Sequence, residues 1–497
     1  MKKVILLSSL IPALILSGCS QIPTYQKPQT QLPTQPVWQK AKPTTPITLA
    51  VDEKTWWQEL TGDSTLQTLI DEALLHNSDI ALAKLNLQQA QLLLNQSSAA
   101  QFPAVSVTSG LARTKSSDEA YPVGKGATFG DFSLGGLLSY ELDLWGRVDA
   151  LNQQAQANFK ATQADQKTVQ LSVTSAVAQA YLNLMAFNQN VKIAENTVQS
   201  RTETLELRQT QLEYGSVTPL NVHQAEAELA AVQIALHQKQ EQRDLQLHAL
   251  AVLVGKSPKA LTEMAEQNLS TQALTEYNSL PVPNAMPSDL LERRPDILAM
   301  EQRLIAANAN IGVAKAALFP SISLTGLLGF QSEALSRLFN GDSVTWNASA
   351  AINAPIFDYG KRQSQVQISE AQQQAMVINY QQTIRTAFKE VLDALTQLEA
   401  SAQQLDAQKR QVVALNQILD LSQKRFDAGY SSYLEVLDAQ RNLFNAELAQ
   451  VTMMLSHSSA LVNLYKALGG NWRTGLLLSS NISKNAKVLA PFDVAYP

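Results

Sequence analysis

The chain has 497 residues, a net charge of −5 and a charged fraction of 16%, with one cysteine and five histidines. A chain of this length can bury a large core, and its mild charge gives no reason to expect a nucleic-acid partner. One cysteine excludes a disulfide framework and a thiolate metal cluster, and the histidines show no metal-ligand spacing, so we expect no cofactor.

The N-terminal segment, residues 1–18, has the pattern of a lipoprotein signal peptide. Two lysines precede an uncharged run at residues 4–16, which is too short for a permanent transmembrane helix. The run ends in Leu16-Ser17-Gly18-Cys19, which resembles the bacterial lipobox, where the cysteine becomes the lipidated first residue of the mature protein. A chance cysteine is the alternative. Ser20 follows in place of aspartate, and the same resemblance then favours sorting to the outer membrane.

Residues 19–60 are expected to form an extended, lipid-anchored strap. Six prolines interrupt the segment between Gln21 and Pro46, and proline-rich chains favour extended conformations over packed elements. Trp56 and Trp57 mark the expected start of ordered structure.

The chain repeats itself, which is the strongest internal signal. Gly146, Gly215 and Gly255 recur at one constant offset as Gly360, Gly429 and Gly469. Phe102-Pro103 and Asp79-Ile80 recur at a second, slightly longer offset as Phe319-Pro320 and Asp296-Ile297. We therefore predict two structural repeats at residues 61–255 and 287–469, a linker at 256–286 and a C-terminal tail at 470–497.

Each repeat is predicted to contain a helix, two strands, a long helix, a turn and a last helix. In the first repeat the helical patterns cover residues 65–101, 152–214 and 220–254, with strand patterns between 104 and 145. The turns lie at Gly215 and Gly429, which interrupt the helical periodicity. Apolar residues recur in steps of four and three along both long helices, which predicts coiled-coil packing.

Four segments alternate apolar and polar residues with period two. Their lengths suit a tilted transmembrane β-strand. The apolar sets include Val105, Val107 and Leu111; Phe132, Leu134 and Leu138; Ile322, Leu324 and Leu328; and Trp346, Ile352 and Ile356. On periodicity alone, a soluble antiparallel sheet with one buried face explains the pattern equally well.

Geometry limits the transmembrane interpretation. Four strands cannot close a barrel, and open edges are not tolerated in lipid, so several copies of the chain would have to share one barrel. Two copies would give eight strands and an interior filled by side chains, whereas three would give twelve and leave a lumen. A conduit therefore implies at least three copies.

Four motifs, together with the lipobox and the duplication, resemble the outer-membrane factor family, the TolC-like channels of tripartite efflux pumps. The motifs are Tyr140–Arg147 (YELDLWGR), Glu292–Ile297 (ERRPDI), Ala317–Pro320 (ALFP), and Ala428-Gly429 with Leu437–Arg441 (LDAQR). The resemblance covers nearly the whole mature chain and is specifically to the lipoprotein branch.

The resemblance implies an α+β membrane protein of the outer membrane of a Gram-negative bacterium. It would be a homotrimer with a twelve-stranded transmembrane β-barrel, four strands per chain, continued by a long α-helical coiled-coil barrel across the periplasm. Its partners would be a periplasmic adaptor protein, an inner-membrane pump and outer-membrane lipid, with a covalent lipid on Cys19. The implied function is export of small molecules such as drugs; polypeptide secretion and metal-ion export are alternatives.

The resemblance also implies a gate at the periplasmic tip of the channel. Leu434 and Asp438 would line the constriction, with Glu435 beside them, and Arg441 would pair with a neighbouring acidic group. In the first repeat Asn221 and Gln224 stand at the places of Glu435 and Asp438. The acidic charge of the gate would therefore come from one helix pair per chain.

An enzyme and a periplasmic coiled-coil lipoprotein scaffold are the alternatives from other classes. Glu435 and Asp438 lie along one helix turn, whereas glycoside hydrolases place two carboxylates across a substrate cleft. We therefore do not expect an enzyme. A scaffold would explain the coiled coil and the lipobox, but not four strands of transmembrane length.

Overall fold

The computed structural model describes residues 20–28, 63–117, 119, 128–257, 259–260, 263 and 294–470. The signal segment with Cys19, most of the strap with Trp56 and Trp57, most of the linker, and residues 471–497 lie outside the described residues. The predictions for these segments stay predictions.

The chain forms two compact units, and the long helices contribute to both. The first unit comprises residues 20–28, Leu85–Ala164 and Ala299–Gln382, and it contains all four strands. The second comprises the described parts of Gln31–Lys84, Asp165–Leu298 and Thr383–Pro497. Helices α5 (Arg147–Glu213) and α10 (Lys361–Asp427) have 67 residues each.

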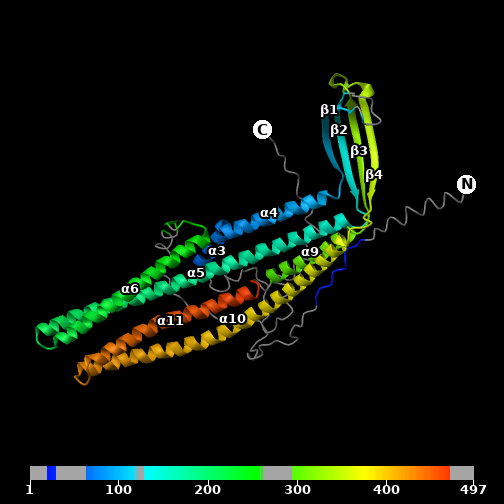
Figure 1. The fold of residues 1–497 in the computed structure, drawn as a ribbon. Coiled ribbons are helices and arrows are strands. Elements are labelled where there is room, and N and C mark those ends of the chain that lie inside the picture. Colours follow the sequence, from blue (N-terminus) through cyan, green and yellow to red (C-terminus); the bar gives the residue numbers. More distant parts are fainter. Residues whose placement is uncertain are drawn as a thin grey trace. The chain divides into compact units, whose positions relative to one another are not determined.

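The four strands form one antiparallel sheet in the order β1-β2-β3-β4 (Figure 1). They are β1 (Ala104–Lys115), β2 (Thr128–Leu142), β3 (Ser321–Ser332) and β4 (Val344–Asn353), with short 3₁₀ helices η2 (Leu335–Arg337) and η3 (Gly341–Ser343) between β3 and β4. We predicted that the last strand continues to Ile356, but this was wrong because β4 ends at Asn353. Pro355 follows and has no N–H to donate to a ladder.

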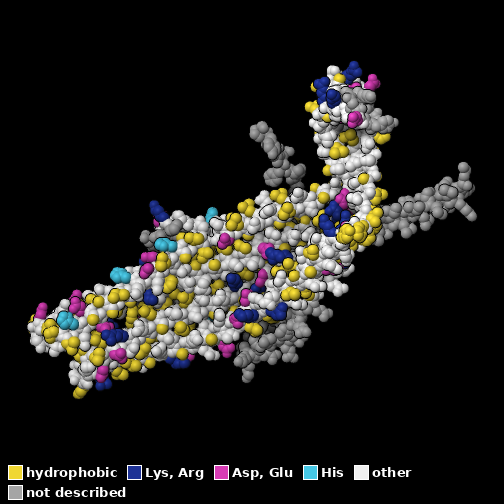
Figure 2. Space-filling view, in the orientation of Figure 1, with side chains coloured by type: hydrophobic (Ala, Val, Ile, Leu, Met, Phe, Trp, Pro, Cys, Tyr) yellow, Lys and Arg dark blue, Asp and Glu magenta, His cyan; other side chains and the backbone are white. Residues whose placement is uncertain are grey.

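The register places the predicted apolar residues on one face of the sheet. Leu111 lies opposite Phe132, Leu134 opposite Phe330, and Ile322 opposite Ile352. This face is largely exposed in the single chain, as Val107, Leu111 and Trp346 show. Figure 2 shows yellow and white side chains over the middle of the sheet, with dark blue Lys and Arg gathered at the end where β1 stops and β2 begins.

The predicted helix at residues 65–101 is in fact two helices, α3 (Ser64–His76) and α4 (Ser78–Ala99). Asn77 separates them in an extended conformation. Its Oδ1 accepts hydrogen bonds from the backbone N–H of Asp79 at 2.9 Å and of Ile80 at 3.2 Å, and it thereby caps α4. The prediction of one helix was wrong because an internal cap does not interrupt apolar periodicity.

The same contact recurs in the second repeat with a different residue. Asn77 Nδ2 donates to the carbonyl oxygen of Leu253 at 2.8 Å, near the end of α6 (Pro219–Val254). Arg294, the counterpart of Asn77 in the second repeat, donates through Nη1 to the carbonyl oxygen of Ala467 at 2.8 Å. Ala467 ends α11 (Tyr433–Ala467) and is the counterpart of Leu253. The two repeats therefore share this contact, in which a side chain donates to a carbonyl at the end of the last helix.

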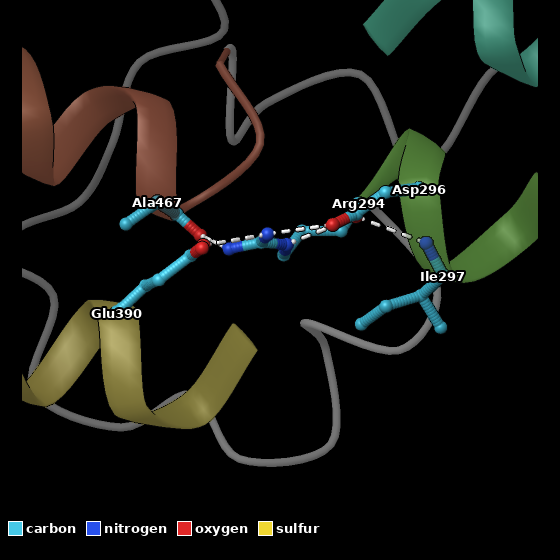
Figure 3. A network of polar contacts seen from close by, with 5 residues as sticks. All are labelled: Arg294, Asp296, Ile297, Glu390 and Ala467. Carbon is cyan, nitrogen blue, oxygen red and sulfur yellow. Dashed lines mark hydrogen bonds and ion pairs between the residues drawn. The ribbon is translucent and has the colours of Figure 1, made fainter. Parts of the chain in front are cut away.

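Arg294 is buried and is the centre of a network of polar contacts (Figure 3). Its guanidinium forms ion pairs with Asp296 at 2.6 Å and with Glu390 of α10 at 2.8 Å. Burial opposes its charge, but the hydrogen bonds to both carboxylates outweigh burial and raise the pKa of Arg294. The network ties the start of α9 (Pro295–Ala316) to α10 and to the end of α11.

The core of the second unit lies between α3, α5, α6, α10 and α11. It includes Leu66, Val177, Tyr181, Leu250, Val391 and Leu461. Val177 of α5 and Val391 of α10 are counterparts in the two repeats, and both are buried. Among the described helices, none is long and apolar enough to cross a bilayer.

Residues 20–28 pack against α9 within the first unit. Lys27 forms an ion pair with Glu301 at 3.0 Å, and Asn308 Nδ2 donates to the carbonyl oxygen of Pro23 at 2.7 Å. A Cβ at Gly312 would lie 2.8 Å from Ile22, so this close approach requires glycine. The part of the predicted strap that the structure describes contains neither helix nor strand.

Candidate channel gate

The two helical hairpins end in the same kind of turn. Gly215 and Gly429 have φ values of +70° and +76°, in the left-handed region that favours glycine. Ser216 N–H donates to the carbonyl of Gln211, and Tyr430 N–H to that of Arg425, both at 2.8 Å. These bonds satisfy carbonyls at the helix ends, so both turns are Schellman-type C-caps.

The start of α11 has a buried side. Tyr433, Val436 and Leu437 are buried and form a small cluster with Leu419 and Phe426 of α10. The spacing of three and four residues places the buried side chains on one face of the helix. This packing fixes which side of α11 faces away from its own hairpin.

Three of the predicted gate residues lie on that other side. Leu434 is 56% exposed, and Glu435 and Asp438 are exposed as well. Glu435 lies 3.8 Å from Arg425 of α10, and Asp438 accepts a hydrogen bond from Asn442 at 3.1 Å. The structure brings these carboxylates close along the helix.

Arg441, the fourth predicted residue, contacts the other hairpin. Its Nε donates to Oε1 of Glu228 on α6 at 2.8 Å, and Nη2 contacts the same oxygen. Glu228 is only 6% exposed. The hydrogen bond to Glu228 raises the pKa of Arg441. This ion pair links the first hairpin, α5 and α6, to the second, α10 and α11.

Two arginines of α5 were not predicted as site residues. Arg201 and Arg208 are each 4% exposed, although arginine is rarely buried so completely. Arg201 Nη1 donates to Oε1 of Gln440 on α11. Burial lowers the pKa of Arg201, and the charge of Glu228 opposes this shift.

Arg208 lies over two neighbouring aromatic rings of the second hairpin. Its guanidinium carbon is 4.8 Å from the ring centre of Phe426 and 4.3 Å from that of Tyr433. Each such cation–π contact is worth about 0.5–2 kcal/mol, more when it is desolvated. Together with the ion pair these contacts define the hairpin-linking cluster, which comprises Arg201, Arg208, Glu228, Phe426, Tyr433, Gln440 and Arg441.

The sequence did carry one signal for this cluster. Arg201 and Arg208 are seven residues apart on one of the two long helices predicted to form a coiled coil. Residues seven apart share a face in a coiled coil, so both arginines were expected on one face of α5. Their partners in the second hairpin lie more than 200 positions further along the chain and could not be predicted from this spacing.

A cavity of about 450 Å³ lies beside the cluster, between α5, α10 and α11. Its lining includes Arg201, Gln440, Glu447 and Met454. Burial raises the pKa of Glu447. In the part of the chain that the structure describes, no group of three or more His, Cys, Asp or Glu residues could hold a metal ion.

A four-stranded antiparallel sheet of transmembrane length, joined to two long helical hairpins with equivalent tips, defines the TolC-like fold. The chain belongs to the family described as "Outer membrane efflux protein", whose model matches residues 69–256 and again 286–470. The predicted family, the four-stranded fold and the internal duplication are therefore confirmed. The protein is an outer-membrane channel component of an efflux pump and extends into the periplasm; its role is transport and not catalysis.

Known proteins are similar to this chain over almost its whole length. The antibiotic efflux pump outer membrane protein ArpC of Pseudomonas putida is 37% identical over 470 residues, which are 94% of this chain and 96% of that protein. The cation efflux system protein CusC of Escherichia coli is 34% identical over 466 residues, 93% of this chain and 97% of that protein. The crystal structure of the open state of the Neisseria gonorrhoeae MtrE outer membrane channel matches with a TM-score of 0.80, at 28% identity, over 91% of this chain and 98% of that one.

Proposed function

We propose that three copies of this chain close a twelve-stranded barrel in the outer membrane and export small organic molecules through it. One observation carries this proposal. Within the described residues β1 and β4 have no strand on their outer sides, while the apolar face of the sheet is exposed. An unpaired edge is costly in lipid, so strands of other copies must pair with both edges. Twelve strands are enough to leave a lumen.

The gate of this channel is formed by the exposed face at the start of α11. Leu434, Glu435 and Asp438 of each copy contribute to a ring at the tip. The hairpin-linking cluster holds α11 against the first hairpin and thereby keeps the ring narrow. Opening requires α11 to move away from α6, which separates Arg441 from Glu228. The exposure of the three side chains and the burial of Glu228 support this assignment.

A lipid on Cys19 anchors the chain. The described strap begins at Ser20, the next residue, and Gln21 N–H donates to the carbonyl of Trp145 at 3.3 Å. Trp145 lies just beyond the end of β2. A lipid attached here lies next to the end of the sheet, where a bilayer surface is expected. The docked strap thus supports an anchor that inserts into the same membrane as the strands.

The channel works with a periplasmic adaptor protein and an inner-membrane pump. Antibiotics or similar organic molecules are the first substrate class, because ArpC is named for antibiotic efflux. Export of metal cations is the second candidate, because CusC is named for cation efflux and is nearly as similar. A deletion strain distinguishes the two. Sensitivity to drugs supports the first class, and sensitivity to metal cations alone supports the second.

The assembly itself is tested on gels. A barrel shared by three copies is expected to resist detergent at room temperature and to dissociate on heating. The unheated band therefore corresponds to three chains and the heated band to one. A single-chain band in both lanes would contradict the proposed channel and would favour the scaffold alternative.

A further inference from the structure

We propose that Arg113 and Lys115, at the outer end of β1, bind the phosphate groups of the glycolipid that forms the outer leaflet of the outer membrane. These two residues are called the outer cation pair. The inference rests on the proposed barrel and names a lipid that contacts it. The partner is lipopolysaccharide, whose lipid A part carries phosphates on a diglucosamine next to the acyl chains.

The first step is to locate this end of the sheet. At their other ends the four strands connect to the helices α4, α5, α9 and α10. The channel extends from the outer membrane into the periplasm, so these helical ends of the strands face the periplasm. The β1–β2 and β3–β4 connections therefore lie at the cell exterior. Lys and Arg side chains gather at this end in Figure 2.

The outer cation pair lies on the lipid-facing side of β1. Side chains alternate along a strand, so Arg113 and Lys115 share the face of Leu111. The register agrees, because Arg113 lies opposite Gly130, just beyond the pair that Leu111 forms with Phe132. Leu111 and Phe132 belong to the apolar face. Both cations therefore point towards lipid and not into the lumen.

The height of the apolar face places the outer cation pair at the lipid headgroups. On β2 this face runs from Phe132 to Leu142. About ten residue steps of 3.4 Å, at a tilt of about 40°, give a height of about 25 Å. The apolar band of outer-membrane barrels is also about 25 Å tall. Arg113 lies just beyond the level of Phe132, so it stands outside the acyl chains and next to the phosphates.

Charges of opposite sign lie on the two faces of this end. Asp131 of β2 lies on the lumen side, where it accepts a hydrogen bond from Nε2 of Gln331 at 3.0 Å. Arg113 and Lys115 are exposed, and no acidic side chain among the described residues forms an ion pair with either. Glu333, just beyond β3, is separated from β1 by β2. The lipid side thus offers cations without a protein partner, which suits an anionic headgroup.

Aromatic side chains near the same level mark a membrane interface. Phe330 lies on the apolar face of β3, and the ring of Phe339 packs edge-on against it with ring centres 5.6 Å apart. Trp346 of β4 lies on the same face and is 74% exposed. Aromatic girdles of outer-membrane barrels lie at the boundary between acyl chains and headgroups. The proposed surface therefore combines apolar contacts for acyl chains with cations for phosphates.

Native mass spectrometry of the purified trimer tests the proposal with lipid A as the probe. EDTA is present, so that no divalent cation bridges a phosphate to a carboxylate. Arg113→Gln/Lys115→Gln is expected to bind lipid A at least about tenfold more weakly than the wild type, because each cation near an anionic lipid surface adds to the affinity. Dephosphorylated lipid A should bind the wild type as weakly as lipid A binds this variant.

A charge-matched variant is the first control. Lys160→Gln/Lys361→Gln removes the same charge from exposed positions on α5 and α10, outside the sheet. It should bind lipid A like the wild type, because neither lysine lies at the outer end of the strands.

A second control keeps the composition and changes only the face. The variant Ala112→Arg/Arg113→Ala/Thr114→Lys/Lys115→Thr exchanges each cation with its neighbour, which turns both cations towards the lumen. It should bind lipid A as weakly as Arg113→Gln/Lys115→Gln does.

The outcomes separate the lipid site from the channel. Unchanged affinity of Arg113→Gln/Lys115→Gln, or an equal loss in the charge-matched control, overturns the site. Equal affinity of the wild type for lipid A and its dephosphorylated form overturns phosphate recognition, and release of lipid A by millimolar inorganic phosphate shows a site for free anions instead. Single-chain particles before lipid is added overturn the proposed function itself. Detergent-resistant trimers of the variants show that the substitutions have not prevented folding.

Discussion

Arg441 of α11 and Glu228 of α6 form an ion pair between the two helical hairpins of one chain. The side chain of Glu228 is 8% exposed and that of Arg441 is 53% exposed. The carboxylate has therefore lost most of its water, and it depends on the guanidinium for compensation. The pair ties the hairpin that carries the proposed gate to the hairpin that does not.

Removal of Arg441 is expected to destabilise the helical unit. Arg441→Ala leaves a buried carboxylate without its charged partner, which costs about 1–3 kcal/mol. Glu228→Gln keeps an acceptor for Arg441 and is expected to cost less. The apparent melting temperature of the detergent-solubilised protein measures both. The control is Arg410→Ala, which breaks an exposed pair with Asp406 and is expected to cost less than about 1 kcal/mol. Equal effects of Arg441→Ala and Arg410→Ala would contradict the assignment.

Arg294 is expected to be more important for stability than any exposed arginine or lysine of the same unit. Arg294→Ala leaves Asp296 and Glu390 without their shared cation and the carbonyl of Ala467 without a donor, at a cost of about 1–3 kcal/mol. We expect a strong loss of detergent-resistant trimer on gels. Lys389→Ala, which breaks an exposed pair with Asp393, is the matched control and should leave the trimer band unchanged. Full trimer yield from Arg294→Ala would be inconsistent with this role.

Glu447 is expected to make stability depend on pH. Its pKa is raised in the folded state by burial, so the folded protein binds the proton more tightly than the unfolded chain. Stability therefore falls as the pH rises above the usual value of 4.5, and the loss is complete once the folded pKa is passed. Glu447→Gln should melt at a higher temperature than the wild type at pH 7, and the difference should disappear at pH 4. A constant difference between pH 4 and pH 7 would exclude this explanation.

Cys19→Ser is expected to abolish lipid attachment, which mass spectrometry or palmitate labelling measures directly. The exposed apolar face belongs to the strands, so the insertion signal lies in the sheet. We therefore expect trimers to assemble without the lipid. Loss of the heat-modifiable band in this variant would show that the lipid is also needed to form the barrel.

The strands and long helices could be predicted because their signals are local. Period two and heptad spacing follow from the backbone geometry of each element, and the duplication supplied every pattern twice. Asn77 shows where this method fails. Its cap of α4 is local, but the apolar pattern continues through the break and hides it. Its bond to Leu253 joins residues 176 positions apart.

The proximity of three proposed gate residues could be predicted for the same reason. Leu434, Glu435 and Asp438 lie within one turn and a half of a helix, so sequence spacing places them together. The contacts between the two hairpins are different. Arg201 contacts Gln440 across 239 positions, and Arg441 contacts Glu228 across 213. Such pairs depend on how the two hairpins pack, which no local pattern contains.

The conductance of single channels in planar bilayers tests the central claim most directly. The wild-type protein should give small currents and should be closed most of the time, because the ring of α11 residues is held narrow. The double variant Asp438→Ala/Arg441→Ala removes the ring carboxylate and the tie to Glu228, and it should increase the conductance severalfold. Unchanged conductance would contradict a gate at this tip, and the absence of any current from either protein would contradict the channel.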